Sequence, residues 1–161
     1  MSTAIIITGT ICSGKTTISE MISERLNIPL FSEGNVFPRG LTGILDAIKS
    51  GKFTDSVLVE HADILNFMDD IVRYFDKQIM ILLNVSEKIL TDNLDNRKSK
   101  SIIGDYLNVD ICQMKKNIIK KFEELKGEKI TYVVDITDHS DYERACENIV
   151  EFLSSNLHVR S

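Results

Sequence analysis

The sequence predicts a single α/β domain in which a five-stranded parallel sheet lies between two layers of helices, forming a three-layer sandwich. Short apolar runs alternate with amphipathic stretches along the 161 residues, which is typical of βαβ units. No repeat, low-complexity block or linker divides the chain, and a domain of this length needs no metal or disulfide for stability. We expect one domain over residues 1–157 and a loose tail over residues 158–161.

The first predicted unit is a strand, a glycine-containing loop and a helix. Residues 4–7 are an apolar run, and residues 9–16 read GTICSGKT. This is a full match to the phosphate-binding pattern of Gly, four free positions, Gly-Lys, then Ser or Thr. Apolar residues at helical spacing follow it. They are Ile18, Met21, Ile22 and Leu26.

The next segments predict two strands with a loop and a short helix between them. Residues 28–31 form a short strand, and residues 32–43 are rich in Gly, Pro and polar side chains, which indicates a functional loop. A helix is expected over residues 44–49, ending at Gly51. Residues 56–59 predict a buried strand that finishes at Glu60.

The central part of the chain predicts a helix over residues 62–75 from its apolar spacing and a central strand over residues 79–85. Ser86 is placed to cap the following helix, which we expect to run to about Arg97. Residues 98–108 contain Ser, Lys and Gly without periodicity, and they are interpreted as a mobile connection.

The last elements are a helix, a fifth strand and a final helix. Residues 109–125 show helical periodicity and end near Gly127, residues 130–134 predict the strand, and residues 140–153 carry one apolar stripe. Polar clusters follow the carboxyl ends of the predicted strands, where ligands bind in parallel α/β sheets.

The phosphate-binding pattern predicts a nucleoside triphosphate site, with ATP and Mg²⁺ as ligands. Glycines let the backbone curl so that N–H groups point into one cavity, and the helix adds its positive dipole end. Lys15 would contact the β and γ phosphates, the Thr16 hydroxyl would ligate the magnesium ion, and Thr17 would contact the α phosphate. The expected nucleotide-binding residues are Gly9, Thr10, Ile11, Cys12, Ser13, Gly14, Lys15, Thr16 and Thr17.

Composition indicates which binding partners and which cellular compartment to expect. The net charge of −5 disfavours binding to extended nucleic acid. Cys12, Cys112 and Cys146 are widely spaced and lack a ligand or disulfide pattern, so reduced thiols are expected. No basic signal region and no apolar run of about 18 residues is present. We expect a cytoplasmic protein without a membrane partner.

Five segments together resemble the adenylate-kinase-like P-loop phosphotransferases, which include nucleoside monophosphate kinases and kinases of metabolites such as shikimate and gluconate. These segments are GTICSGKTT, SEGNVFPRG, VLVEH, LLNVSEKILTDNLDNRK and YVVDIT. The resemblance implies a nucleotide-kinase type of P-loop fold. It also implies an acceptor-binding region over residues 32–51 and an arginine-bearing lid over residues 97–108.

The resemblance also implies roles for single residues. Arg39 is the expected acceptor-binding cation, because a guanidinium matches a phosphate or carboxylate; the alternative is a surface arginine. Arg97 is expected to neutralise charge on the transferred phosphoryl group; the alternative is a cation that favours the helix dipole. The basic positions that follow are Lys98 and Lys100, where the family often has a second arginine.

Carboxylates at strand ends are further candidates. Glu60 would hold metal, water or an acceptor group, while Glu33 and Asp63 are additional carboxylates that are interpreted mainly as solvated charges. Asp135 either touches the nucleotide or caps the turn before Thr137.

Two more residues near the predicted site, His61 and Cys12, are interpreted as structural and not as catalytic residues. His61 is interpreted as a partly exposed histidine and not as a base. Cys12 is expected to have a lowered thiol pKa beside Lys15 and the helix end, which raises a hypothesis of oxidative control. The favoured alternative is a small side chain tolerated in a tight loop.

The sequence therefore predicts an ATP-dependent phosphotransferase that moves the γ-phosphoryl group to a small acceptor, with a nucleoside monophosphate preferred. Lys15, Arg97 and Glu60 are the predicted catalytic residues, and Glu33 and Arg39 the predicted acceptor-binding residues. A kinase acting on an alcohol is the alternative enzyme, and an ATPase switch that controls a protein partner is the alternative of another class. No N-K-x-D or T-K-x-D motif occurs, so ATP is the expected nucleotide.

Overall fold

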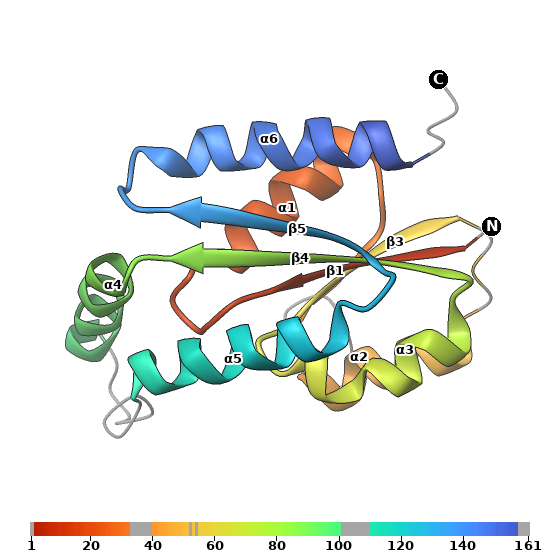
Figure 1. Cartoon of the computed structure of the whole chain (residues 1–161), viewed down its shortest axis with the longest axis horizontal. Helices are drawn as coiled ribbons and strands as arrows, with labels where there is room; N and C mark the ends of the chain where they lie inside the picture. Colours follow the sequence, from red (N-terminus) through yellow and green to blue (C-terminus); the bar gives the residue numbers. More distant parts are fainter. Residues whose placement is uncertain (1, 33–39, 52, 54, 101–109, 158–161) are drawn as a thin grey trace.

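The strands of the computed structural model, which describes residues 2–32, 40–51, 53, 55–100 and 110–157, form one parallel sheet. The strand order is β2-β3-β1-β4-β5 (Figure 1), and every pairing is parallel. This confirms the predicted five-stranded parallel sheet. The strands are β1 (Thr3–Thr8), β2 (Leu30–Phe31), β3 (Ser56–Glu60), β4 (Lys77–Val85) and β5 (Ile130–Ile136).

Helices cover both faces of this sheet. Figure 1 shows α1 (Lys15–Leu26) and α6 (Asp141–Asn156) above it. On the lower side lie α2 (Leu41–Ser50), the 3₁₀ turn η1 (Ile64–Phe67), α3 (Met68–Tyr74) and α5 (Ile111–Leu125). The remaining helix, α4 (Glu87–Lys100), lies beyond the arrowheads of β4 and β5, at the carboxyl ends of the strands. The three-layer arrangement agrees with the prediction.

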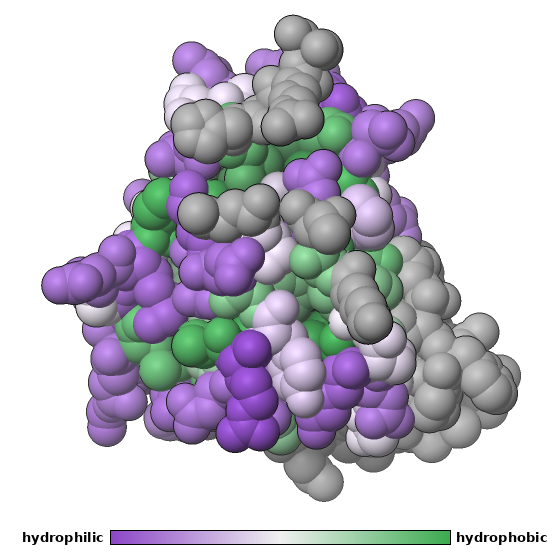
Figure 2. Space-filling view, turned by 90° about the vertical axis from the view of Figure 1, so that its right-hand side faces the viewer, coloured by the Kyte–Doolittle hydropathy of each residue, from purple (hydrophilic) through white to green (hydrophobic). Residues whose placement is uncertain are grey.

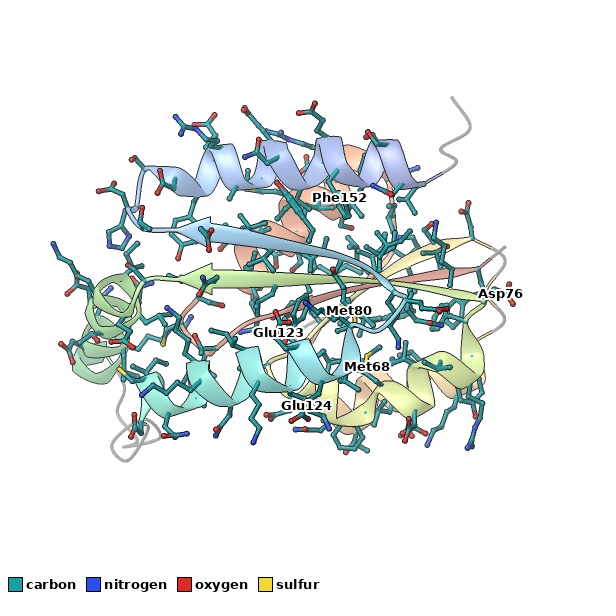
Figure 3. All side chains as sticks on the ribbon, in the orientation of Figure 1. Met68, Asp76, Met80, Glu123, Glu124 and Phe152 are labelled. Atoms are coloured by element: carbon teal, nitrogen blue, oxygen red, sulfur yellow. The ribbon has the colours of Figure 1, made fainter. Side chains whose placement is uncertain are left out.

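Two hydrophobic clusters hold the layers together, one on each face of the sheet. Alternate residues of β1 feed the two clusters, with Ile5 and Ile7 on the α1 and α6 side and Ala4 and Ile6 on the other. Because both faces are buried, the strand is a continuous apolar run and not an alternating one. Figure 3 shows Met68 and Met80 in the lower cluster. On the upper face, the Phe152 ring of α6 packs edge-on against Tyr132 at a centroid distance of 4.6 Å.

The amino ends of β1 and β4 are fastened to each other. The Ser2 amide donates a hydrogen bond to Asp76 Oδ2 at 3.0 Å, and the Asp76 amide donates one to Ser2 Oγ at 3.1 Å. Figure 2 shows this end of the molecule, with hydrophilic side chains surrounding smaller hydrophobic areas. This contact helps to fix the register of β1 against β4. It lies at the opposite end of β1 from the loop that joins β1 to α1.

The structure corrects the predicted helix over residues 62–75. The chain leaves β3 through a turn in which the Asp63 amide donates to His61 Nδ1 at 3.0 Å, continues as η1 and becomes helical only at Met68. Apolar spacing does not separate a 3₁₀ turn from an α-helix over so few residues. Asp69 and Asp70 lie in the first turn of α3, where their negative charges interact favourably with the positive end of the helix dipole.

Other boundaries differ by a few residues. The prediction that residues 98–100 belong to a connection is wrong, because α4 continues to Lys100; no Gly or Pro stands before Gly104 to end it. Residues 101–109, which include the rest of the predicted lid, lie outside the described part. Ser86 caps α4 as expected, since the Ile89 amide donates to Ser86 Oγ. No helix among the described residues is long and apolar enough to cross a membrane.

Candidate functional site

The loop between β1 and α1 has the conformation that the glycine pattern predicts. Cys12 and Gly14 both adopt left-handed backbone conformations, with φ of 65° and 84°. Gly9 lies so close to its neighbours that a Cβ there would be 3.0 Å from Ser13 Oγ and 3.2 Å from the Leu83 carbonyl oxygen. Alternating helical and left-handed residues make a concave row of N–H groups that suits an anion.

Buried hydroxyl groups around this loop fit a phosphate ligand. Within the described part of the chain, the Thr8, Thr10 and Ser13 hydroxyls are buried and form no hydrogen bond. A buried donor without a partner costs about 1–3 kcal/mol. Phosphate oxygens accept hydrogen bonds from hydroxyl groups and from the first amides of a helix, so a triphosphate would satisfy both.

Lys15 lies at the first position of α1 with its side chain only 7% exposed. Its Nζ donates a hydrogen bond to the Thr10 carbonyl oxygen at 2.6 Å, across the loop. Burial lowers the pKa of the Lys15 ammonium, and the nearby Glu60 carboxylate opposes that shift. The Lys15 ammonium is therefore fixed inside the loop, and its contact with phosphate stays a prediction.

Two cavities adjoin the loop. The first, which we call the α4–α6 cavity, has a volume of about 600 Å³ and lies between α1, α4 and the start of α6. The second, the β3 cavity, has a volume of about 290 Å³ and lies between the loop and the carboxyl end of β3. Cys12, Gly14, Thr17 and Arg97 line both cavities. The two spaces therefore meet at the loop and at Arg97.

The β3 cavity carries two of the predicted carboxylates, Glu60 and Asp63. Glu60 is 5% exposed at the end of β3, and Asp63 and Glu20 line the same space. The Thr16 side chain is exposed in this cavity. Hydroxyl and carboxylate oxygens are the protein ligands that Mg²⁺ prefers, and the residues present therefore fit this ion.

Arg97 is exposed where the two cavities meet. The structure therefore brings together Lys15, Glu60 and Arg97 around the loop. Glu33 and Arg39, the predicted acceptor-binding residues, lie outside the described residues, and their roles stay predictions.

The structure also describes three residues that the sequence singled out, Cys12, Asp135 and His61. The expectation of a lowered pKa for Cys12 is wrong: burial raises the pKa of this thiol, and the positive charges of Arg97 and Lys15 only partly offset that rise. Asp135 accepts a hydrogen bond from Asn84 Nδ2 at 2.7 Å, and it therefore pairs with the neighbouring strand β4. His61 is half-buried and accepts a hydrogen bond at Nδ1, in agreement with its structural interpretation.

Residues from α4 and α6 complete the site, and sequence reasoning missed them. Asn93, His139, Tyr142 and Glu143 line the α4–α6 cavity, and Asn93 and Tyr142 also bind loop carbonyls. Asn93 stands one helical turn before Arg97, which is the sequence signal that it shares a face with that residue. Nothing in the sequence pattern places the start of α6 beside a loop about 130 residues earlier.

Several solved structures with a similar fold are kinases of small molecules. A sugar kinase from Janibacter sp. matches with a TM-score of 0.64 at 12% identity, covering 100% of this chain and 99% of that chain. A gluconokinase from Sinorhizobium meliloti matches with a TM-score of 0.61 at 17% identity over 95% and 94% of the two chains. A deoxyadenosine kinase from M. mycoides with bound dATP matches with a TM-score of 0.64 at 22% identity over 93% and 98%.

No protein-family model and no curated protein matches the chain. The structural likenesses define its fold, which is the P-loop kinase fold with an all-parallel sheet. The fold class predicted from the sequence is confirmed, and the kinases with this fold include the metabolite kinases that the motif resemblance indicated.

Proposed function

We propose that the protein is an ATP-dependent phosphotransferase that moves the γ-phosphoryl group of ATP to a small acceptor. The observation that carries this proposal is the meeting of two cavities at one phosphate loop. The α4–α6 cavity has room for the base and sugar of the donor, and the β3 cavity has room for an acceptor. A hydrolase or a switch needs no second cavity on the far side of the loop.

In this proposal, the loop amides and the Lys15 ammonium bind the β and γ phosphates of the donor. Thr16 and a nearby carboxylate would hold Mg²⁺, which neutralises phosphate charge and orients the leaving group when it is bound. An acceptor oxygen in the β3 cavity attacks the γ phosphorus, the bond to the bridging oxygen breaks, and ADP leaves. Arg97, which lines both cavities, stabilises the negative charge on the transferred group.

For the acceptor, we favour a hydroxyl group over the nucleoside monophosphate that the sequence suggested. Three carboxylates, Glu20, Glu60 and Asp63, line the β3 cavity, and they would repel a dianionic phosphate. A hydroxyl group must lose its proton as it attacks, and Glu60 is a buried carboxylate near Lys15 in this space. In this role Glu60 accepts the hydroxyl proton.

A nucleoside monophosphate remains the second candidate because of one observation. Arg97 lines the β3 cavity as well as the α4–α6 cavity, and a guanidinium binds a phosphate in a bidentate manner. Arg39, predicted for the same task, would add a second cation. A monophosphate acceptor is already ionised and requires no base.

The experiment is a thermal-shift screen followed by a coupled assay of ADP release. The protein is mixed with magnesium, a non-hydrolysable ATP analogue and single acceptors drawn from sugars, hydroxy acids, nucleosides and nucleoside monophosphates. The proposal expects a selective rise in melting temperature for one acceptor, and ADP release with ATP only when that acceptor is present. ADP release without any acceptor, increased by a protein partner, would instead support the switch.

A further inference from the structure

We propose that Asn93 and Tyr142 are positioning residues that hold the phosphate loop in its binding conformation. The inference rests on the proposed function, since it assumes that the loop binds a triphosphate. Asn93 Nδ2 donates a hydrogen bond to the Cys12 carbonyl oxygen at 2.9 Å. Tyr142 Oη donates one to the carbonyl oxygen of the next residue, Ser13, at 3.0 Å. We call this pair of side chains the carbonyl clamp.

The clamp orients amide groups through the geometry of the peptide bond. In a planar trans peptide, the C=O of one residue and the N–H of the next point in opposite directions. A Cys12 carbonyl held toward α4 therefore directs the Ser13 N–H away from that helix. In the same way, a Ser13 carbonyl held by Tyr142 directs the Gly14 N–H away from α6. Two consecutive loop amides are thus aimed by side chains that lie outside the loop.

The loop needs such support because part of its backbone is strained. Cys12 has a side chain yet adopts φ of 65°, a left-handed conformation that is unfavourable for any residue with a Cβ atom. Such a conformation persists when the surrounding structure fixes it. Asn93 binds the carbonyl of this strained residue, and Tyr142 lies directly over Gly14, the other left-handed residue.

The clamp side chains are themselves firmly placed. Tyr142 stands in the first turn of α6, where the Asp141 carboxylate accepts hydrogen bonds from the amides of Thr137 and Asp138 at 3.1 and 3.0 Å. Burial raises the pKa of the Tyr142 hydroxyl, and the nearby Asn93 side chain opposes that rise. Since Asn93 lies one turn before Arg97 on α4, the clamp links the loop to the helix that carries the proposed charge-stabilising arginine.

A simpler role for both residues is that of cavity wall, because both line the α4–α6 cavity. The two roles differ for a ligand that has no base or sugar. If the clamp orients the loop, its loss weakens the binding of inorganic tripolyphosphate. If Asn93 and Tyr142 only contact the nucleoside, tripolyphosphate binds the variants and the wild type equally.

The test measures binding of magnesium-ATP and of magnesium-tripolyphosphate to the full chain by titration calorimetry. Tyr142→Phe keeps the ring and removes one hydrogen bond, and Asn93→Ala removes the other. Each variant is expected to bind both ligands about three- to tenfold more weakly, the effect of one lost hydrogen bond. The double variant is expected to lose less than the product of the single effects, because both act on one loop.

Two matched variants control for general effects. Tyr132→Phe removes a hydroxyl from a ring of β5 that packs on Phe152, and Asn117→Ala replaces an exposed asparagine of α5. Both are expected to bind the two ligands as the wild type does. The melting temperature of each variant without ligand reports any general loss of stability, which by itself does not alter a binding constant measured on folded protein.

Every outcome decides the inference. Weaker binding of both ligands by the clamp variants and not by the controls supports it. If the clamp variants bind ATP more weakly but bind tripolyphosphate as the wild type does, the inference is overturned in favour of the cavity-wall role. A wild type that binds ATP and not tripolyphosphate overturns it in the same way. Unchanged binding of both ligands overturns it as well. A folded wild type that binds neither ligand overturns the proposed function together with the clamp.

Discussion

The ring of Tyr142 occupies the space that a side chain at Gly14 would need. A Cβ atom built at position 14 would lie 2.6 Å from Tyr142 Cε1, which is far inside the contact distance of two carbon atoms. The glycine of the phosphate loop is therefore required for two reasons, its left-handed φ of 84° and the close approach of an aromatic ring.

Gly14→Ala is expected to destabilise the fold more than a glycine substitution that meets only the first of these conditions. Gly127 also has a positive φ, of 39°, but nothing lies within 4 Å of a Cβ built there. We expect Gly127→Ala to lower the free energy of unfolding by about 1 kcal/mol and Gly14→Ala by about 3 kcal/mol or more. Urea denaturation measures both; equal losses would contradict the steric argument.

Lys15→Ala is expected to reduce turnover by about a hundred- to thousandfold, as does the loss of one preorganised charge donor in other enzymes. The Lys15 ammonium is buried within the loop and cannot be replaced by solvent ions at the same place. Steady-state assays of ADP release with the identified acceptor measure the effect. Lys120→Ala, on the exposed surface of α5, is the control, and near-normal turnover in Lys15→Ala would refute the role of Lys15.

Glu60→Gln separates the two classes of acceptor. If the acceptor is a hydroxyl group, loss of the carboxylate removes the base and lowers kcat by about a hundred- to ten-thousandfold. If the acceptor is a phosphate, transfer requires no base, and the change is expected to be less than tenfold. The measurement is kcat for the acceptor found in the thermal-shift screen. A small effect with a hydroxyl acceptor would show that Glu60 is not the base.

The phosphate loop is the part of the site that the sequence specifies best. Its geometry depends on residues that are neighbours in the chain, so the pattern from Gly9 to Thr16 predicts both the turn and the helix that follows. The central strands were equally predictable from the sequence, because burial on both faces of the sheet makes β1, β3 and β4 mostly continuous apolar runs. The end of an exposed helix could not be predicted in the same way. Helix α4 continues from Arg97 to Lys100, and none of the residues after Arg97 is apolar, so no periodic pattern marks this last part of the helix.

The walls of the α4–α6 cavity could not be predicted in this way. Tyr142 and Asn93 reach the loop from helices that lie about 130 and 80 residues further along the chain. Their approach depends on strand order, since β4 and β5 follow β1 on one side of the sheet, and apolar patterns do not encode that order. The sign of the Cys12 pKa shift was missed for a similar reason, because burial by these distant elements outweighs the charge of adjacent Lys15.

Arg97→Ala is expected to lower kcat by about a hundred- to thousandfold with little change in the melting temperature. The exposed guanidinium contributes little to stability, but it lies where the α4–α6 cavity and the β3 cavity, the proposed donor and acceptor sites, meet. Arg97→Lys is expected to recover only part of the activity, since an ammonium lacks the planar fork. Arg144→Ala, an exposed arginine of α6, is the matched control. A change confined to the melting temperature would support the helix-dipole role instead.

Cys12 is expected to resist alkylation and oxidation in the folded protein. The thiol is 2% exposed, and burial raises its pKa above the ordinary value, so the reactive thiolate forms only at higher pH than in an unfolded chain. With iodoacetamide at neutral pH, mass spectrometry should find the partly exposed Cys112 modified well before Cys12. The pKa of the Cys112 thiol is raised as well, so the difference between the two thiols reports access. Unfolding in urea should make both thiols react at similar rates, as expected if burial in the fold protects Cys12. Cys12→Ser should leave the peroxide sensitivity of the protein unchanged, whereas a loss of that sensitivity would restore the hypothesis of oxidative control through the phosphate loop.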